Sequence, residues 1–166
     1  MSIPDSRLTF CKIFYFGRRR SSAVHLPPSS MRTMIARPIH VAILDDDPSV
    51  RAALVRLLKG AKMIADAYET SGELFEAIAR KCPDCLLLDL QMPEMDGVEV
   101  LKYLDQRHIR IPSIVITGSD EAGSRATCLN AGATGYLSKP VDAAQLIQMI
   151  DRISEAPRSG ARASFG

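Results

Sequence analysis

Four separate segments of the chain place a chemically active side chain directly after a short apolar run. In chain order these side chains are Asp45-Asp46-Asp47, Asp89, Thr117 and Lys139. Carboxylates are hard oxygen ligands that suit Mg²⁺, which uses one or two of them and keeps several waters. A lysine and a hydroxyl group can bind an anion on the other side of such a cation. The residue types therefore suit a divalent cation held next to a phosphate.

One of the acids is a candidate nucleophile, because an aspartate carboxylate can attack phosphorus and form an aspartyl phosphate. We choose Asp89, which stands alone after its apolar run and is expected to be a bare carboxylate at the mouth of a loop. Asp47 precedes Pro48 and is assigned to the start of a helix as its N-cap. Acids that lie close together repel, so their pKa values are expected to rise unless a cation separates them.

The hydrophobic pattern predicts the elements that would bring these positions together, because short apolar runs alternate five times with helix-spaced stripes. The expected strands cover 39–44, 62–68, 85–88, 112–117 and 134–138. The expected helices cover 48–60, 70–81, 97–107, 119–132 and 142–155. Capping boxes are expected at Thr70-x-x-Glu73 and Asp142-x-x-Gln145, and Gly60 is expected to stop the first helix.

Short apolar strands separated by helices predict an α/β fold with a parallel sheet covered on both faces. For five such units the leading candidate is a flavodoxin-like, doubly wound sheet with strand order 2-1-3-4-5. Ligands in these sheets bind beyond the carboxyl ends of the strands, where the strand order reverses. The acids, the hydroxyl group and the lysine all follow strands that end at this edge.

Composition and charge exclude several other classes of protein. Of 166 residues, 46% are hydrophobic and 24% are charged, as in globular proteins, and we find no apolar run long enough for a membrane span. Four cysteines are too few for a disulfide framework, which favours a cytoplasmic protein. Residues 1–38 hold seven basic residues and one acid, whereas 39–166 hold 14 basic residues and 18 acids. The acidic body has no basic stripe, so direct DNA binding is not expected.

Three segments are expected along the chain: a basic, disordered extension over 1–37, one domain over 38–155 and a flexible tail over 156–166. The extension has no sustained helical or strand period. Its alternative interpretations are a tether, a weak contact with membrane or nucleic acid, and an artefact of the assigned translation start.

Together the segments "VAILDDDPSVRAALVRLL", "LLLDLQMPEMDGVEVL", "IPSIVITG" and "AGATGYLSKPVDAAQL" resemble the receiver domain of two-component response regulators, closest to the FixJ-like branch. The resemblance covers about residues 38–155. It implies that Asp89 is the phosphorylated residue. It further implies that Asp46 and Asp89 bind Mg²⁺ directly, with Mn²⁺ as a substitute, that Asp45 acts mostly through water, and that the backbone carbonyl of Gln91 is a further ligand.

The same resemblance implies how phosphorylation is read out. Thr117 matches the switch hydroxyl group and Lys139 the lysine that pairs with the phosphate. Lys139-Pro140 matches a peptide bond that is cis in the family, and Tyr136 matches an aromatic switch residue. Binding of the new charge by Mg²⁺, Thr117 and Lys139 would shift the surface formed by the fourth helix, the fifth strand and the fifth helix.

These expectations define a stand-alone receiver, a signalling domain rather than an enzyme acting on other substrates. Its partners would be a histidine kinase or histidine phosphotransfer protein and a downstream protein target, with phosphorylation-dependent homodimerisation left open. FixJ-like proteins usually carry a DNA-binding domain, and no segment here is expected to form one.

Two rival functions remain beside the receiver. One is a receiver-like scaffold that needs no phosphorylation. The other is a Mg²⁺-dependent phosphatase that uses an aspartyl phosphate. Such phosphatases generally place an acid/base aspartate two residues after the nucleophile, where this chain has Gln91.

Overall fold

The computed structural model describes residues 37–118 and 123–155. The predicted extension, apart from Arg37, and the predicted tail lie outside these ranges. The strands are β1 (His40–Leu44), β2 (Ile64–Tyr68), β3 (Cys85–Asp89), β4 (Ser113–Thr117) and β5 (Gly135–Ser138). The helices are α2 (Pro48–Gly60), α3 (Ser71–Arg80), α4 (Gly97–Gln106), α5 (Ser124–Asn130) and α6 (Ala143–Glu155).

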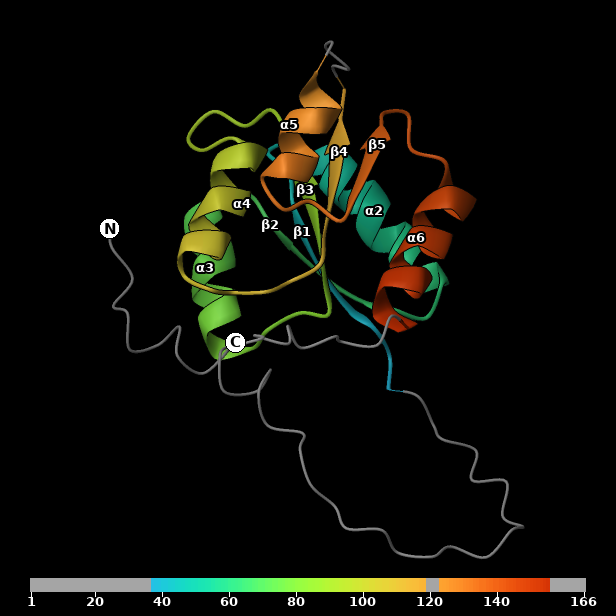
Figure 1. Cartoon of the computed structure of the whole chain (residues 1–166). Helices are drawn as coiled ribbons and strands as arrows, with labels where there is room; N and C mark the ends of the chain where they lie inside the picture. The colour runs from blue at the N-terminus through green and yellow to red at the C-terminus, as the bar shows by residue number, and fades with distance from the viewer. Residues whose placement is uncertain (1–36, 119–122, 156–166) are drawn as a thin grey trace, which may run out of the picture.

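The strands form one parallel sheet in the order β2-β1-β3-β4-β5, which confirms the predicted flavodoxin-like topology. Helices α3, α4 and α5 cover one face of the sheet, and α2 and α6 cover the other (Figure 1). The strand order reverses between β1 and β3, so the loops after these two strands flank a crevice at the carboxyl edge.

The two faces of the sheet bury two separate apolar cores. On β1, Ala42 and Leu44 pack toward α3 and α4, whereas Val41 and Ile43 pack toward α2 and α6. Every residue of β1, β3 and β4 is buried, which explains why these strands read as continuous apolar runs. Such burial fixes the register of the central strands and therefore the positions at which they end.

The predicted helix starts are confirmed in part. The Asp47 carboxylate accepts hydrogen bonds from the backbone N–H groups of Ser49 and Val50 and is the N-cap of α2. The Thr70 hydroxyl accepts one from the N–H of Glu73 at 3.3 Å. The reciprocal bond of a capping box is absent there, because the Glu73 carboxylate accepts from the N–H of Glu69 instead.

Helix α2 ends at the predicted residue, although no glycine takes the left-handed position after it. Gly60 is the last helical residue, and the left-handed residue that follows the helix is Lys62, with φ of 62°. The N–H of Met63 donates to the carbonyl of Leu58, and that of Lys62 to the carbonyl of Lys59. This pattern is a Schellman motif with lysine at the position that usually holds glycine. The hydrogen bonds, rather than a glycine, therefore end the helix.

Helix α5 is shorter than predicted. We expected helix from residue 119, but α5 begins at Ser124, because Gly123 before it has a left-handed φ of 96°. Residues 119–122 lie outside the described ranges. A helix of this length is marginal by itself and depends on packing against the sheet, where its Cys128 is buried. Among the described residues, no helix combines the length and apolar composition needed to cross a bilayer.

Candidate functional site

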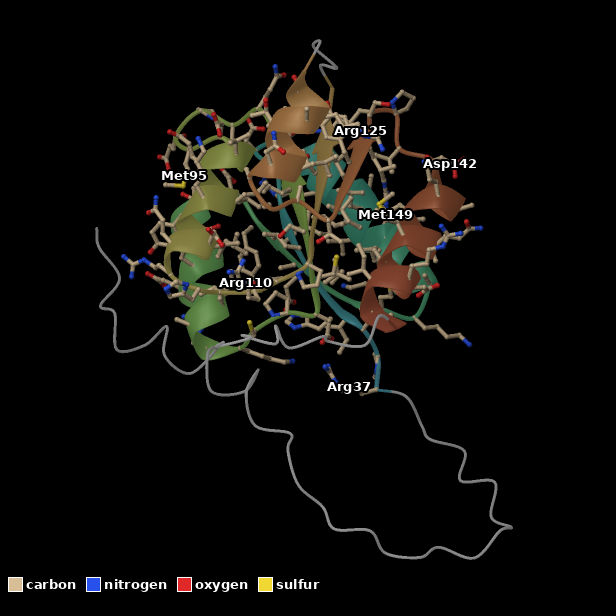
Figure 2. All side chains as sticks on the ribbon, in the orientation of Figure 1. Arg37, Met95, Arg110, Arg125, Asp142 and Met149 are labelled. Carbon is tan, nitrogen blue, oxygen red and sulfur yellow. The ribbon has the colours of Figure 1, made fainter. Side chains whose placement is uncertain are left out.

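The strands deliver the predicted side chains to one end of the sheet. Leu44 on β1 is paired with Leu88 on β3, so Asp45 and Asp89 both come next in the chain at the same level. Thr117 ends β4 opposite Ser138, which precedes Lys139. Figure 2 labels Asp142 near this end of the molecule and Arg37 at the opposite end.

Three carboxylates form a cluster at this edge. One oxygen from each of Asp45, Asp46 and Asp89 lies within 4.8 Å of the others. Asp45 and Asp89 are 2% and 6% exposed, whereas Asp46 is exposed to solvent. The cluster therefore consists of two buried aspartates and one aspartate that is accessible from solvent.

The polar atoms of Asp45 are held by four hydrogen bonds. One carboxylate oxygen accepts from the N–H of Asp47 at 2.9 Å, and the other from Nζ of Lys139 at 2.9 Å. The backbone carbonyl accepts from Nη1 of Arg51 at 2.7 Å. The backbone N–H donates to the carbonyl of Tyr68 at 3.4 Å. Asp45 is thus fixed by contacts from four parts of the chain.

Asp89 is not the bare carboxylate that the sequence suggested. It is the last residue of β3, its side chain is buried, and one of its oxygens accepts from the N–H of Leu90 at 2.8 Å. The other oxygen lies 3.4 Å from Nζ of Lys139. The expectation failed because Asp89 is the last residue of a central strand, where the Leu90 N–H and the Lys139 ammonium group contact its carboxylate.

Lys139 joins the acids to the end of β4. Its ammonium group bridges Asp45 and Asp89, and its backbone N–H donates to the carbonyl of Thr117 at 2.7 Å. Thr117 is fully buried, and the peptide bond between Lys139 and Pro140 is cis. A cation, two acids and a hydroxyl residue are therefore connected through strand ends that are far apart in the sequence.

Burial and charge shift the ionisation of this site. Burial raises the pKa of Asp89, and repulsion from Asp45 adds to that effect, whereas the charge of Lys139 opposes it. For Lys139, burial lowers the pKa, but the hydrogen bond to Asp45 and the charges of both acids outweigh it and raise the pKa. The main cause at Asp89 is thus desolvation, whereas we had expected repulsion between acids.

The donor set fits a hard divalent cation, since all three clustered side chains offer carboxylate oxygens and one of them faces solvent. Lys139 already balances part of the buried negative charge. An incoming anion could bind this ammonium group on the side away from a cation. The geometry can therefore support attack by a carboxylate on a phosphorus atom.

The two remaining predicted residues lie apart from the acid cluster. Gln91 is exposed and lines an open hollow of about 540 Å³ beside Asp46. Tyr136 is 7% exposed and belongs to the core on the α3–α4–α5 face, paired across the sheet with Val115. The hollow gives access to the acidic edge, whereas Tyr136 contributes to packing in this conformation.

Sequence reasoning missed three features that support the site. Arg51 bonds to the Asp45 carbonyl, a contact that no sequence pattern encodes. Asp96 and Glu99 form a complete capping box at the start of α4, and the spacing Asp-x-x-Glu could have revealed it. Gly97 packs directly against the backbone of Asp89.

Replacing Gly97 with alanine should destabilise the fold. A Cβ atom there would lie 2.6 Å from the carbonyl oxygen of Asp89 and 3.1 Å from the Cα of Leu90, so backbone would have to move. Overpacking of this kind costs about 1–3 kcal/mol. We expect Gly97→Ala to lower the free energy of unfolding by that amount in a urea titration.

Gly60→Ala is the matched control. It is also a helical glycine, but no atom lies within 4 Å of its added Cβ. Alanine there should be neutral or stabilise by about 0.5–1 kcal/mol. Equal stability of the Gly97→Ala variant and the wild type would show that the loop after Asp89 is not tightly packed.

Comparisons with a family model and with known proteins indicate the same family. The family model "Response regulator receiver domain" matches residues 41–151. The transcriptional regulator NtrC of Escherichia coli K12, described as DNA-binding, is 38% identical over 112 residues, which are 68% of this chain and 24% of NtrC. Response regulator MprA of Mycobacterium sp. strain KMS is 34% identical over 110 residues, 66% of this chain and 48% of MprA. The chain thus spans about a quarter to a half of these relatives.

Solved structures agree with this assignment of the fold. The crystal structure of FixJ-N has a TM-score of 0.65 and 35% identity, covering 73% of this chain and 97% of that one. The signal receiver domain of a response regulator NarL from Mycobacterium tuberculosis has a TM-score of 0.66 and 25% identity, covering 72% and 98%. The compared folds coincide over nearly the whole of each solved domain.

Proposed function

Since the chain belongs to the response regulator receiver domain family, we propose that it accepts a phosphoryl group on Asp89 from a histidine kinase or a histidine phosphotransfer protein. One observation carries this proposal. The Asp89 carboxylate lies within one cluster with Asp45 and Asp46 and contacts the Lys139 ammonium group. We propose that the domain signals by protein contact rather than acting as an enzyme on other substrates.

Mg²⁺, or Mn²⁺ in its place, would be held by the carboxylates of Asp46 and Asp89, by Asp45 mostly through water, and by the backbone carbonyl of Gln91. The cation would neutralise the negative charge that gathers when a phosphoryl group approaches these acids. The clustered oxygens of the three aspartates support this assignment. The exposed face of Asp46 leaves a path for the cation and for the phosphodonor.

In the proposed transfer, a carboxylate oxygen of Asp89 forms a bond to phosphorus while the bond between phosphorus and the donor histidine nitrogen breaks. The electron pair of that bond leaves with the imidazole ring, which takes up a proton from solvent. Lys139 would bind a phosphoryl oxygen through its ammonium group, and Thr117 would bind another through its hydroxyl group. Both residues act by electrostatic stabilisation and positioning.

The output we propose is a change in the surface made by α5, β5 and α6. Thr117 and Lys139 are joined by a backbone hydrogen bond between β4 and the end of β5, so a pull on either residue would act on both strands. Tyr136 on β5 would change its packing as Thr117 moves toward the phosphoryl group. The short α5 suits an element with two arrangements.

We propose that residues 38–155 form the receiver domain, with residues 1–37 and 156–166 outside it. The helices and strands of the described residues lie within this range. We propose a cytoplasmic protein target as the partner that this domain contacts. Phosphorylation-dependent pairing of two copies through the same surface would fit this output.

Incubation with acetyl phosphate, with Mg²⁺ or with EDTA, tests the proposal by intact mass. We expect one added phosphoryl group in Mg²⁺ and none in EDTA, because the three acids would otherwise repel the incoming anion. A parallel titration with beryllofluoride, a stable phosphoryl mimic, should perturb Tyr136 signals in an NMR spectrum. Absence of both responses would favour a scaffold that works without phosphorylation.

A further inference from the structure

Arg51 on α2 connects two loops at the acidic edge of the sheet. Its Nη1 donates to the backbone carbonyl of Asp45 at 2.7 Å, and its Nη2 donates to a carboxylate oxygen of Glu69 at 2.9 Å. The Arg51 side chain is 16% exposed, whereas that of Glu69 is 63% exposed. One planar guanidinium group thus ties the loop after β1 to the residue that follows β2.

The carbonyl that Arg51 holds belongs to the peptide between Asp45 and Asp46. Because a peptide unit is planar, fixing this carbonyl also fixes the N–H and Cα of Asp46. Asp45 is anchored by bonds to its carboxylate as well, but Asp46 is exposed. The contact with Arg51 fixes the peptide before the Asp46 Cα, and the bond from the Asp47 N–H to the Asp45 carboxylate fixes the peptide after it. Together they set the direction in which the Asp46 side chain leaves the backbone.

Glu69 offsets the positive charge that Arg51 brings near the acid cluster. A positive guanidinium group near the acid cluster would repel a divalent cation. The carboxylate of Glu69 balances that charge at 2.9 Å. Glu69 is itself held, because its N–H donates to the carboxylate of Glu73 at 3.1 Å. The pair can then order the loop while adding little net charge.

We infer that Arg51 is a positioning residue for divalent-cation binding, with Glu69 as its neutralising partner. The inference rests on the proposed phosphoryl-accepting function. Arg51 acts through the Asp45–Asp46 peptide and touches neither the cation nor the phosphodonor. Its contribution is to hold Asp46 ready, so that the cation does not have to order the loop when it binds.

Arg51→Ala should weaken cation binding without slowing the reaction once the site is filled. Loss of a residue that orients metal ligands typically costs about 10–100-fold in affinity. Removing the positive charge of Arg51 should by itself raise the cation affinity about two- to fivefold, the effect of an exposed ion pair. This gain offsets part of the loss. We therefore expect the Mn²⁺ concentration at half-saturation, measured by electron paramagnetic resonance, to rise about tenfold. At saturating Mg²⁺ the rate of phosphoryl incorporation should return to within about twofold of the wild-type rate. The bound cation then orders the carboxylates itself, so their positions no longer depend on Arg51.

Arg56→Ala is the matched control, because Arg56 lies on the same helix and is exposed. It removes the same charge, so cation affinity should stay equal or rise slightly, the opposite sign to Arg51→Ala. Arg51→Lys should give an intermediate loss, since a single ammonium group cannot reproduce the planar fork that reaches both partners.

The Glu69→Gln variant tests the effect of the Glu69 charge separately from the position of Arg51. It keeps the Arg51 bond to the carbonyl but leaves the guanidinium charge unbalanced, so affinity should fall about two- to fivefold. Raising salt from about 0.1 M to about 1 M shortens the screening length from about 10 Å to about 3 Å. At high salt the Mn²⁺ concentration at half-saturation of Glu69→Gln should therefore approach that of the wild type. The difference in half-saturation between Arg51→Ala and the wild type should remain.

The outcomes are distinguishable. If the wild type itself binds no Mn²⁺ and gains no phosphoryl group, the proposed function fails, and this inference fails with it. If the wild type does both, but Arg51→Ala, Arg51→Lys and Glu69→Gln all match it in half-saturation, only the inference is overturned, and Arg51 serves the fold alone. Should Arg51→Ala not fold, as judged by its melting curve, Arg51→Lys and Glu69→Gln decide the question.

Discussion

Asp89→Asn should take up no phosphoryl group from acetyl phosphate in Mg²⁺, while remaining folded. The amide of asparagine is nearly the same size as the carboxylate but is a very poor nucleophile, so no acyl phosphate can form. We expect intact mass to show complete loss of the adduct, the largest effect of any single substitution in this chain. The substitution also removes one carboxylate from the proposed Mg²⁺ site and the ionic contact with Lys139.

The same variant should be more stable than the wild type in EDTA at neutral pH. Burial raises the pKa of Asp89, which means that the ionised carboxylate disfavours the folded state. This cost is present above the folded-state pKa and vanishes below the unfolded value of about 3.9. The gain in melting temperature should thus be a few degrees at pH 7, since about 1 kcal/mol gives about 3–6 °C. It should shrink as the pH falls toward 4.

Asp47→Asn controls for the loss of an acid near the site. Asparagine caps helices as well as aspartate does, so α2 should keep its start. Asp47 is outside the three-acid cluster, and phosphoryl incorporation should continue. An adduct that persists in Asp89→Asn and disappears in Asp47→Asn would overturn our choice of the nucleophile.

The architecture was predictable because it depends on burial that repeats along the chain. Each central strand is buried on both faces, so its run of apolar residues is continuous, and parallel strands with helical crossovers allow few topologies. Once the strand order is known, the acids after β1 and β3 must lie near each other. The clustering of Asp45, Asp46 and Asp89 follows from this topology.

Other features depend on contacts that leave little trace in the local sequence. The bond from Arg51 to a backbone carbonyl could have been made by many long polar side chains. The end of α4 resembles that of α2: His108 takes a left-handed φ of 56°, and the N–H of Ile109 donates to the carbonyl of Leu104. Glycine is the residue usually found there, so the sequence predicted where both helices end but not the left-handed residue that follows each of them.

Lys139 has two opposed roles, and they lead to the second large prediction. Its ammonium group lies 2.9 Å from Asp45 and 3.4 Å from Asp89, both buried. It therefore stabilises these acids, but it also competes with a divalent cation for the same oxygens. Lys139→Met removes the charge and keeps much of the side-chain length.

In EDTA, Lys139→Met should lower the free energy of unfolding by about 3 kcal/mol, because two buried carboxylates lose their cation. The affinity for Mn²⁺ should rise instead, by about tenfold, since no lysine competes for the acids. Mg²⁺ should then raise the melting temperature of the variant more than that of the wild type. Lys102→Met, an exposed lysine on α4, should change none of these quantities.

Phosphoryl incorporation into Lys139→Met should nevertheless fall, by about 10²–10³-fold, the usual cost of removing one group that stabilises charge in a transition state. Tighter cation binding combined with slower reaction separates Lys139 from the metal ligands. Asp46→Asn, for comparison, should weaken both cation binding and reaction. If Lys139→Met weakened both as well, the lysine would be ordering the acids rather than competing with the cation. That result would contradict the proposal that Lys139 binds the phosphoryl group.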